Sequence, residues 1–273
     1  KEYRTYANYD DYGTVAIYQP NETAAGNLTK FFINYYDSDG ILLDSVTLEK
    51  KLANGAFDTW STNADKQILF LGCYPGNLQN WSATSNIPSA ALLQGGSISI
   101  NGTNAVGDVT MAPFRIYINC PGNLGYEPIR LAWLNQWGAW DYWTFNKKSI
   151  RTFKTKGTTY TQLQGSWNKS KYTLETHRGG KKTFRVNSRE EIKINTDFVG
   201  EEYNVMFEEL INSPEVYLLE GYQTDPGFSA LNNYVTPVTL KTSSFTKKTS
   251  ANDNLVQYTF DIEKTLTLRT QAI

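Results

Sequence analysis

Apolar and polar residues alternate in short segments along the first half of the chain. Alternation with a period of two residues places the apolar side chains of a β-strand on one face and the polar side chains on the other. Turn-forming residues separate these segments at the spacing expected of a sandwich or a barrel. The strands predicted in this half are 15–18, 31–36, 41–48, 68–71, 97–100 and 114–118.

The sequence Asp37-Ser38-Asp39-Gly40 lies between two of these strands. Aspartate and glycine are favoured in tight turns, so this segment predicts a hairpin. A calcium-binding loop also begins with spaced aspartates, but it needs a glutamate at its twelfth position, where this chain has Leu48. The pattern therefore favours a turn.

Four tryptophans, Trp133, Trp137, Trp140 and Trp143, lie within a segment of alternating residues in the middle of the chain. Residues 130–134 and 139–145 predict a hairpin closed by Asn135-Gln136-Trp137-Gly138, in which Trp133 lies opposite Trp140 and Leu131 opposite Tyr142. We expect Trp133 and Trp140 to face the interior, because most such rings belong to a core. Trp137, at the turn, is the ring expected to contact a partner.

The segment 147–193 is rich in lysine and arginine and has few acidic residues. Residues 172–175 and 183–186 alternate around His177-Arg178-Gly179-Gly180, which predicts a hairpin with a solvated polar face. A phosphate-binding track is the alternative, but no glycine-rich loop leads into a helix N-terminus. Nucleic acid is therefore not an expected partner.

One helix is predicted, over about 198–212, with Asp197 as its N-cap and with Asn212-Ser213-Pro214 ending it. A strand at 216–219 and a closing antiparallel pair, 237–245 and 255–264, follow it. The polar turn of that pair suits an arm that contacts a neighbouring subunit. The apolar stripe of the helix is Val205, Phe207 (or Met206), Leu210 and Ile211, and the turn contains Asn252, Asp253 and Asn254.

The fold class is therefore mainly β, with two sandwich-like or barrel-like domains and one helix packed on the sheet of the second. We place the first domain at residues 1–126 and the second at 127–273. The formal net charge of −1 gives no chain-wide field that would attract nucleic acid or an anionic membrane. No apolar run is long enough to span a bilayer, so no membrane partner is expected.

Few residues suit catalysis. His177 is the only histidine, and the sequence has no nucleophile elbow, Walker loop or dinucleotide fingerprint. Adjacent carboxylates occur, but neighbours in sequence diverge in space, so they do not predict a glycosidase. The sequence predicts no enzymatic activity, no cofactor and no metal site, and it predicts that Cys73 and Cys120 are buried free thiols rather than a disulfide.

The segment 134–145 has the pattern Leu-Asn-x-x-Gly-Ala-x-Asp-x-x-x-Phe and is followed by Lys147-Lys148. It resembles structural proteins of tailed bacteriophages, especially those of marine and Bacteroidetes phages, including crAss-like phages. The order of later motifs is also similar: Asn-Ser-Pro-Glu-Val-Tyr-Leu at 212–218, Pro237-Val238, and Phe-x-Lys-Lys-Thr-x-x-Asn-Asp-Asn-Leu at 245–255. The resemblance covers roughly the second half of the chain.

The resemblance implies a non-enzymatic component of the tail, collar or baseplate of a virion, assembled in the cytoplasm of a bacterial host. Its expected partners are further copies of itself, in a ring or tube, and other virion proteins. A carbohydrate-binding or receptor-binding module that uses exposed tryptophans is the alternative. The residues predicted to contact partners are Trp137, Trp140, Trp143, Lys147, Lys148, Asn252, Asp253 and Asn254.

Overall fold

The computed structural model describes residues 3–18, 28, 30–49, 68–79, 88, 93–104, 107–120, 125–165, 170–174, 177, 179–220, 234–244, 246–247, 255–266 and 268–269. Strands account for 54% of the described residues and helices for 10%, which confirms the mainly β prediction. The chain divides into two compact units, Lys1–Asn146 with Asn212–Pro214, and Lys147–Ile211 with Glu215–Ile273. This division keeps the tryptophan segment in the first unit, whereas the sequence placed the boundary between residues 126 and 127.

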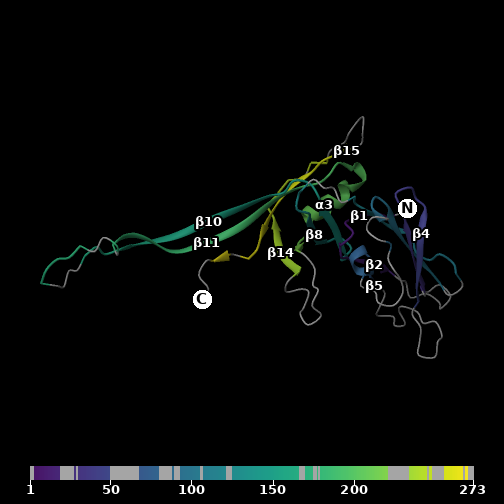
Figure 1. The fold of residues 1–273 in the computed structure, drawn as a ribbon, viewed down its shortest axis with the longest axis horizontal. Coiled ribbons are helices and arrows are strands. Elements are labelled where there is room, and N and C mark those ends of the chain that lie inside the picture. The colour runs from purple at the N-terminus through teal and green to yellow at the C-terminus, as the bar shows by residue number, and fades with distance from the viewer. Residues whose placement is uncertain are drawn as a thin grey trace, which may run out of the picture. The chain divides into compact units, whose positions relative to one another are not determined.

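A five-stranded sheet forms one layer of the first unit (Figure 1). All six strands predicted in the first half of the chain are present. A further strand, β1, was missed because its inward residues Thr5 and Ala7 are small or polar and give no apolar signal. In sheet order the strands are β1 (Tyr3–Ala7), β7 (Phe114–Ile118), β6 (Ser97–Thr103), β3 (Lys30–Tyr36) and β4 (Leu42–Glu49), with β1 parallel to β7 and the other pairs antiparallel.

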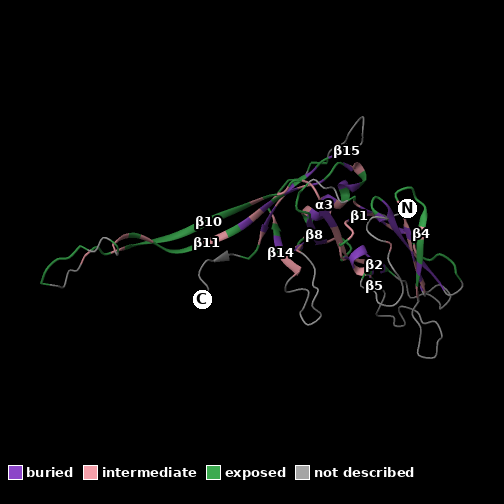
Figure 2. Cartoon of the chain, in the orientation of Figure 1, coloured by how far each residue is buried: buried purple, intermediate pink, exposed green. Residues whose placement is uncertain are grey.

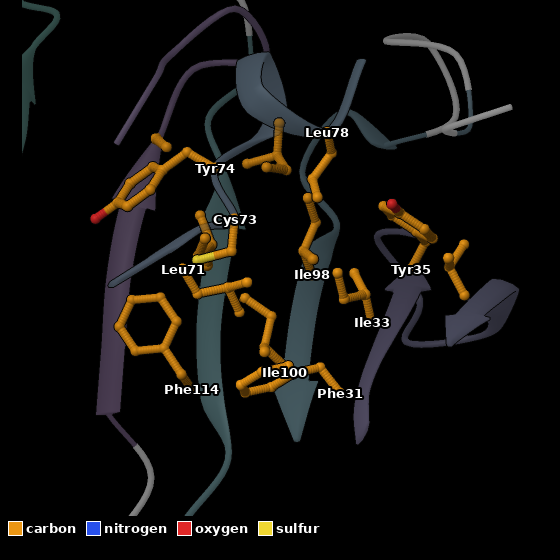
Figure 3. Packing of buried hydrophobic residues seen from close by; sticks show 14 of the residues in the cluster. Phe31, Ile33, Tyr35, Leu71, Cys73, Tyr74, Leu78, Ile98, Ile100 and Phe114 are labelled. Atoms are coloured by element: carbon orange, nitrogen blue, oxygen red, sulfur yellow. The ribbon is translucent and has the colours of Figure 1, made fainter. Parts of the chain in front are cut away.

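The antiparallel pair of β2 (Thr14–Tyr18) and β5 (Ile68–Gly72) forms a second layer, and the short helix α1 (Pro75–Gln79) follows β5. Side chains from both layers meet in one buried cluster, which makes the unit sandwich-like (Figure 3). In α1, the Tyr74 carbonyl accepts hydrogen bonds from the backbone N–H groups of Asn77 (2.9 Å) and Leu78 (3.1 Å). The cluster includes Phe31, Ile33, Leu71, Tyr74, Leu78, Ile98, Ile100 and Phe114.

The predicted turn between β3 and β4 is confirmed. Asp37 Oδ1 accepts hydrogen bonds from the backbone N–H of Asp39 (2.9 Å) and of Ile41 (2.7 Å). Gly40 has φ 80°, a left-handed conformation that glycine adopts without a steric penalty. The aspartate side chain and the glycine together fix the tight connection.

The second unit contains a run of five antiparallel strands. The predicted strand after the helix is present as β13 (Val216–Leu219). The predicted closing pair is also present, with shorter strands, as β14 (Val235–Leu240) and β16 (Thr259–Lys264). Two short strands, β12 (Val199–Gly200) and β15 (Leu255–Val256), pair separately, and β17 (Leu268–Arg269) pairs with β11. The order of the run is β10 (Ile150–Gln162), β11 (Gly180–Asn195), β16 (Thr259–Lys264), β14 (Val235–Leu240) and β13 (Val216–Leu219).

The predicted helix begins later than expected, as a 3-10 turn η1 (Glu201–Tyr203) followed by α3 (Asn204–Asn212). Asp197 is not its cap, because the intervening β12 is held in an extended conformation by β15. The predicted end at Asn212 is confirmed. Phe207 and Leu210 are buried as predicted, and the Phe207 ring lies 5.6 Å from the rings of Tyr258 and Phe260, whereas Val205 is exposed.

Candidate assembly surfaces

The tryptophan segment forms an antiparallel hairpin, β8 (Ile129–Leu134) and β9 (Trp140–Phe145). Its predicted register is wrong by one residue, since Leu134 lies opposite Trp140 and Leu131 opposite Trp143. The reason is the turn. Asn135 Oδ1 accepts hydrogen bonds from the N–H of Trp137 (3.0 Å) and of Ala139 (2.9 Å), and Gly138 has φ 76°. The last hydrogen-bonded backbone pair is therefore Asn135 with Ala139, which leaves three residues in the turn rather than the four predicted.

The four tryptophans have different environments. Trp133 is fully buried, as predicted, and Trp140 is half-buried without the predicted cross-strand contact to Trp133. Trp143, predicted to contact a partner, is instead buried against the edge of the Tyr6 ring at 5.8 Å. Trp137 is 81% exposed at the turn. Of the four rings, Trp137 is therefore the one most open to a partner.

A buried arginine attaches the hairpin to the rest of the first unit. The Arg130 guanidinium donates to Asp11 Oδ2 (3.0 Å), to Thr144 Oγ1 (2.8 Å) and to the carbonyl of Tyr12 (2.7 Å). It also lies over the rings of Tyr74 and Tyr142, at 5.0 and 5.1 Å. Hydrogen bonds and an opposite charge compensate the burial of this cation, so the hairpin has a fixed position in its unit.

The remaining residues predicted to contact partners differ in their environments. Lys147 forms an ion pair with Asp197 at 3.0 Å. The Lys148 side chain is exposed, and its carbonyl accepts a hydrogen bond from Asn195 Nδ2 at 2.7 Å. The predicted turn that contains Asn252, Asp253 and Asn254 lies outside the described residues.

The longest exposed feature of the second unit is the ribbon of β10 and β11, which extends beyond the other strands of that unit (Figure 1). We call residues 153–190 the arm, because β16 pairs with β11 only from Glu191 onward. The predicted hairpin of 172–175 with 183–186 is wrong, since residues 180–183 and 185–193 pair with β10. Residues 152–161 are all exposed, so β10 has no buried face to give it an apolar signature (Figure 2).

Large apolar side chains lie exposed along the arm. Phe153 is 58% exposed and Phe184 is 66% exposed, and the rings of Tyr160 and Phe184 meet edge to face at 6.5 Å. Phe184 lies where the pairing of β10 and β11 shifts by one residue. The cations Lys156, Lys181, Lys182 and Arg185 have no ion pair within the described residues.

At the base of the arm, the charged residues are paired. Glu190 is buried and contacts Arg151 (2.6 Å) and Lys264 (3.3 Å), and Lys264 also contacts Glu220 (2.7 Å). Burial by itself would raise the pKa of Glu190, but Arg151 and Lys264 outweigh it and hold that pKa below its ordinary value. These contacts fix where the arm leaves the sheet.

A second group of charges stabilises the base of the arm at Glu263. Lys241 (2.6 Å) and Arg189 (3.1 Å) contact this carboxylate, and the hydrogen bond from Lys241 is the main cause that lowers the pKa of Glu263. Lys154 pairs with Glu191 at 2.6 Å. Part of the basic stretch at 147–193 is thus neutralised by acidic residues of its own chain.

Both cysteines are free thiols, as predicted. Cys73 is buried, and burial raises the pKa of its thiol well above the usual range. Cys120 is exposed, so the prediction that it is buried is wrong. The exposed thiol is the one accessible to modifying reagents.

Comparisons of the chain with protein-family models, with curated proteins and with solved structures found no match. Within the described ranges, no helix has the length and apolar character needed to cross a membrane. The same part of the chain contains no group of three or more His, Cys, Asp or Glu side chains placed to hold a metal ion. Function must therefore be inferred from the exposed surfaces themselves.

Proposed function

We propose that this chain is a non-enzymatic structural protein of a phage virion, which self-associates into a ring or tube and docks to other virion proteins. The observation that carries the self-association is the arm, a two-stranded ribbon with Phe153, Tyr160 and Phe184 exposed. The virion context is supported by the resemblance of residues 134–145 to structural proteins of tailed phages. The tail, collar and baseplate are the parts of the particle concerned.

An isolated two-stranded ribbon is marginally stable in water, because neither of its faces is covered. Beyond the short pairing of Asn187 and Ser188 with β17, the arm is such a ribbon, and residues 152–161 of β10 are exposed. Contact with another protein surface would bury its aromatic rings and order its side chains together. A ribbon of this kind is suited to assembly, since it reaches a neighbour without altering the core of its own unit.

Carbohydrate or receptor binding is the alternative that the tryptophans suggested. A sugar-binding platform benefits from several exposed rings, but Trp133 and Trp143 are buried and Trp140 is half-buried. Trp137 alone among the four is largely exposed, which gives only a small platform. We therefore favour contact with proteins over contact with glycans.

Size-exclusion chromatography with light scattering tests the proposal on the full chain and on a variant with a shortened arm. In the variant, Thr155 and Ser188, which are paired in the ribbon, are joined by Asn-Gly, a two-residue hairpin turn. We expect the wild type to form a discrete oligomer and the variant to remain a folded monomer. A wild type that stays monomeric at all concentrations and never enters particles would overturn the proposal.

A further inference from the structure

The charges of this chain are segregated between the arm and the rest of the sequence. Residues 153–190 contain nine lysines and arginines and two glutamates, a formal charge of +7. Because the whole chain carries −1, the remaining residues carry −8. Residues 1–146 alone have thirteen acidic and eight basic residues, a charge of −5. Such opposite charges favour contact between copies where both regions are exposed.

One face of the arm carries a row of cations. Side chains alternate between faces along each strand, so Lys154 and Lys156 share a face with Arg185 and Arg189 of the opposite strand. Lys154 and Arg189, nearest the base, have acidic partners in their own chain. Lys156 and Arg185, farther out, have none within the described residues, so their charges are available to another molecule.

Strand β4 of the first unit has complementary properties. It forms one edge of the five-stranded sheet and, in the described part of the chain, pairs only with β3. Its eight residues include neither lysine nor proline, two of the residues that protect sheet edges from pairing, although it carries Asp44 and its pairing with β3 shifts register between Tyr35 and Tyr36. Ile41 and Leu42, where the hairpin enters the strand, are 62% and 52% exposed.

Acidic side chains lie beside these apolar residues. Asp39 and Asp44 are exposed, and neither has an ion pair within the described residues. The hairpin of β3 and β4 therefore presents a backbone edge that pairs with no other described strand, exposed apolar side chains, and carboxylates that have no ion pair among the described residues. Strand β10 also lies at the end of its sheet, so its outer backbone groups face no other described strand.

We propose that β10 of one copy adds to β4 of a second copy as a further strand, with Lys156 and Arg185 close to Asp39 and Asp44 of that copy. This inference rests on the proposed function and names the surfaces that would form the assembly. Backbone hydrogen bonds would join the two edges, and the opposite charges would select the partner. The cations of the arm could also bind a nucleic acid, but that binding would not bury the exposed apolar side chains of Ile41 and Leu42 at the β4 edge.

A charge-swap experiment tests the contact by light scattering and analytical ultracentrifugation of the full chain. We expect K156E/R185E and D39K/D44K each to raise the dissociation constant of the assembly about tenfold, because two exposed ion pairs become repulsive. The four substitutions combined should restore assembly to about the level of the wild type. The matched controls are K156R/R185K, which keeps the charges, and D10K, which reverses an exposed acid outside the hairpin; neither should change assembly.

The outcomes separate the inference from the function on which it rests. A wild type that never oligomerises would overturn the proposed function. If the wild type oligomerises and both charge-reversed variants assemble as tightly as it does, only this contact is overturned. If K156E/R185E loses binding to a 30-base-pair DNA duplex while D39K/D44K assembles normally, the partner of the arm is a nucleic acid and the contact is wrong.

Carbodiimide crosslinking provides a second test that does not depend on the folding of any variant. In an assembly of copies with two different nitrogen isotopes, we expect mixed-isotope crosslinks that join Lys156 to Asp39 or Asp44. The reagent joins amines to carboxylates without a spacer, so such crosslinks place the two side chains in direct contact. Crosslinks between copies that never include the hairpin of β3 and β4 would contradict the contact.

Discussion

The hairpin of β8 and β9 and the arm of β10 and β11 have the same antiparallel pairing but opposite environments. Five of the six residues of β8 are buried, and Arg130 among them is held by Asp11 and Thr144. Nearly every residue of β10 is exposed, and Lys156 has no ion pair within the described residues. The first hairpin is stabilised by its own unit, whereas the second has the features of a surface that another molecule completes.

The comparison predicts that substitutions in the two hairpins affect different measurements. In β8, the change should appear in the free energy of unfolding of the isolated chain. In the outer part of the arm, at Lys156 and Arg185, it should appear in the assembly, with the stability of the isolated chain nearly unchanged. The base of the arm, at Glu190, contributes to stability through its ion pairs. The expected effects follow, from the largest to the smallest.

Trp133→Ala should have the largest effect, a loss of about 3–5 kcal/mol in the free energy of unfolding, because it truncates a fully buried side chain. Urea denaturation of the monomeric protein measures this loss. Trp137→Ala, in the same hairpin, is the matched control. Equal losses of stability in the two variants would contradict the assigned difference in burial.

Glu190→Gln should destabilise the base of the arm by about 2 kcal/mol at pH 7, since it removes a buried charge from Arg151 and Lys264. The pKa of Glu190 is lowered in the folded state, so its contribution is present above the ordinary glutamate pKa of 4.5 and is lost as the pH falls below that value. The difference between variant and wild type should therefore shrink in acid.

The control for this prediction is Glu191→Gln, which removes the single ion pair with the exposed Lys154 and should cost less than about 1 kcal/mol. Urea denaturation at pH 7 and pH 3 measures both variants. A difference between Glu190→Gln and wild type that stays constant over this range would show that the charge of Glu190 is not the source of the stabilisation.

Trp137→Ala should have the smallest effect on stability, within about 0.5 kcal/mol, because its side chain is 81% exposed and its turn is held by Asn135 and Gly138. It should nevertheless weaken assembly, which light scattering at graded concentrations would reveal. Unchanged assembly would remove Trp137 from the candidate partner surface.

The first unit was the more predictable of the two. Its strands combine one buried face with clear turn signals, as in the segment Asp37-Ser38-Asp39-Gly40, so alternation located them. The register of the tryptophan hairpin was not predictable to one residue, because the turn length depends on the Asn135 side chain and the conformation of Gly138. The alternation of residues 130–134 predicts the strand, but it does not predict which residue of β9 lies opposite each of them.

The arm could not be located from the same signal. Residues 152–161 have no buried face, so their pairing with β11 has no apolar signature in the sequence. The contacts of Glu190 with Arg151 and Lys264 join residues distant in sequence, so no local sequence pattern predicts them. The sequence shows that this segment is basic. Only the structure shows that the cations near the base of the arm have acidic partners, whereas those farther out have none within the described residues.

Amide hydrogen exchange, compared between the monomeric and assembled fractions of the wild type, tests most directly whether the arm is completed by another copy. We expect the amides of 153–162 and 180–190 to exchange rapidly in the monomer and at least about tenfold more slowly in the assembly, while those of β8 and β9 remain protected in both. An arm that is equally protected in the two fractions would contradict the central claim.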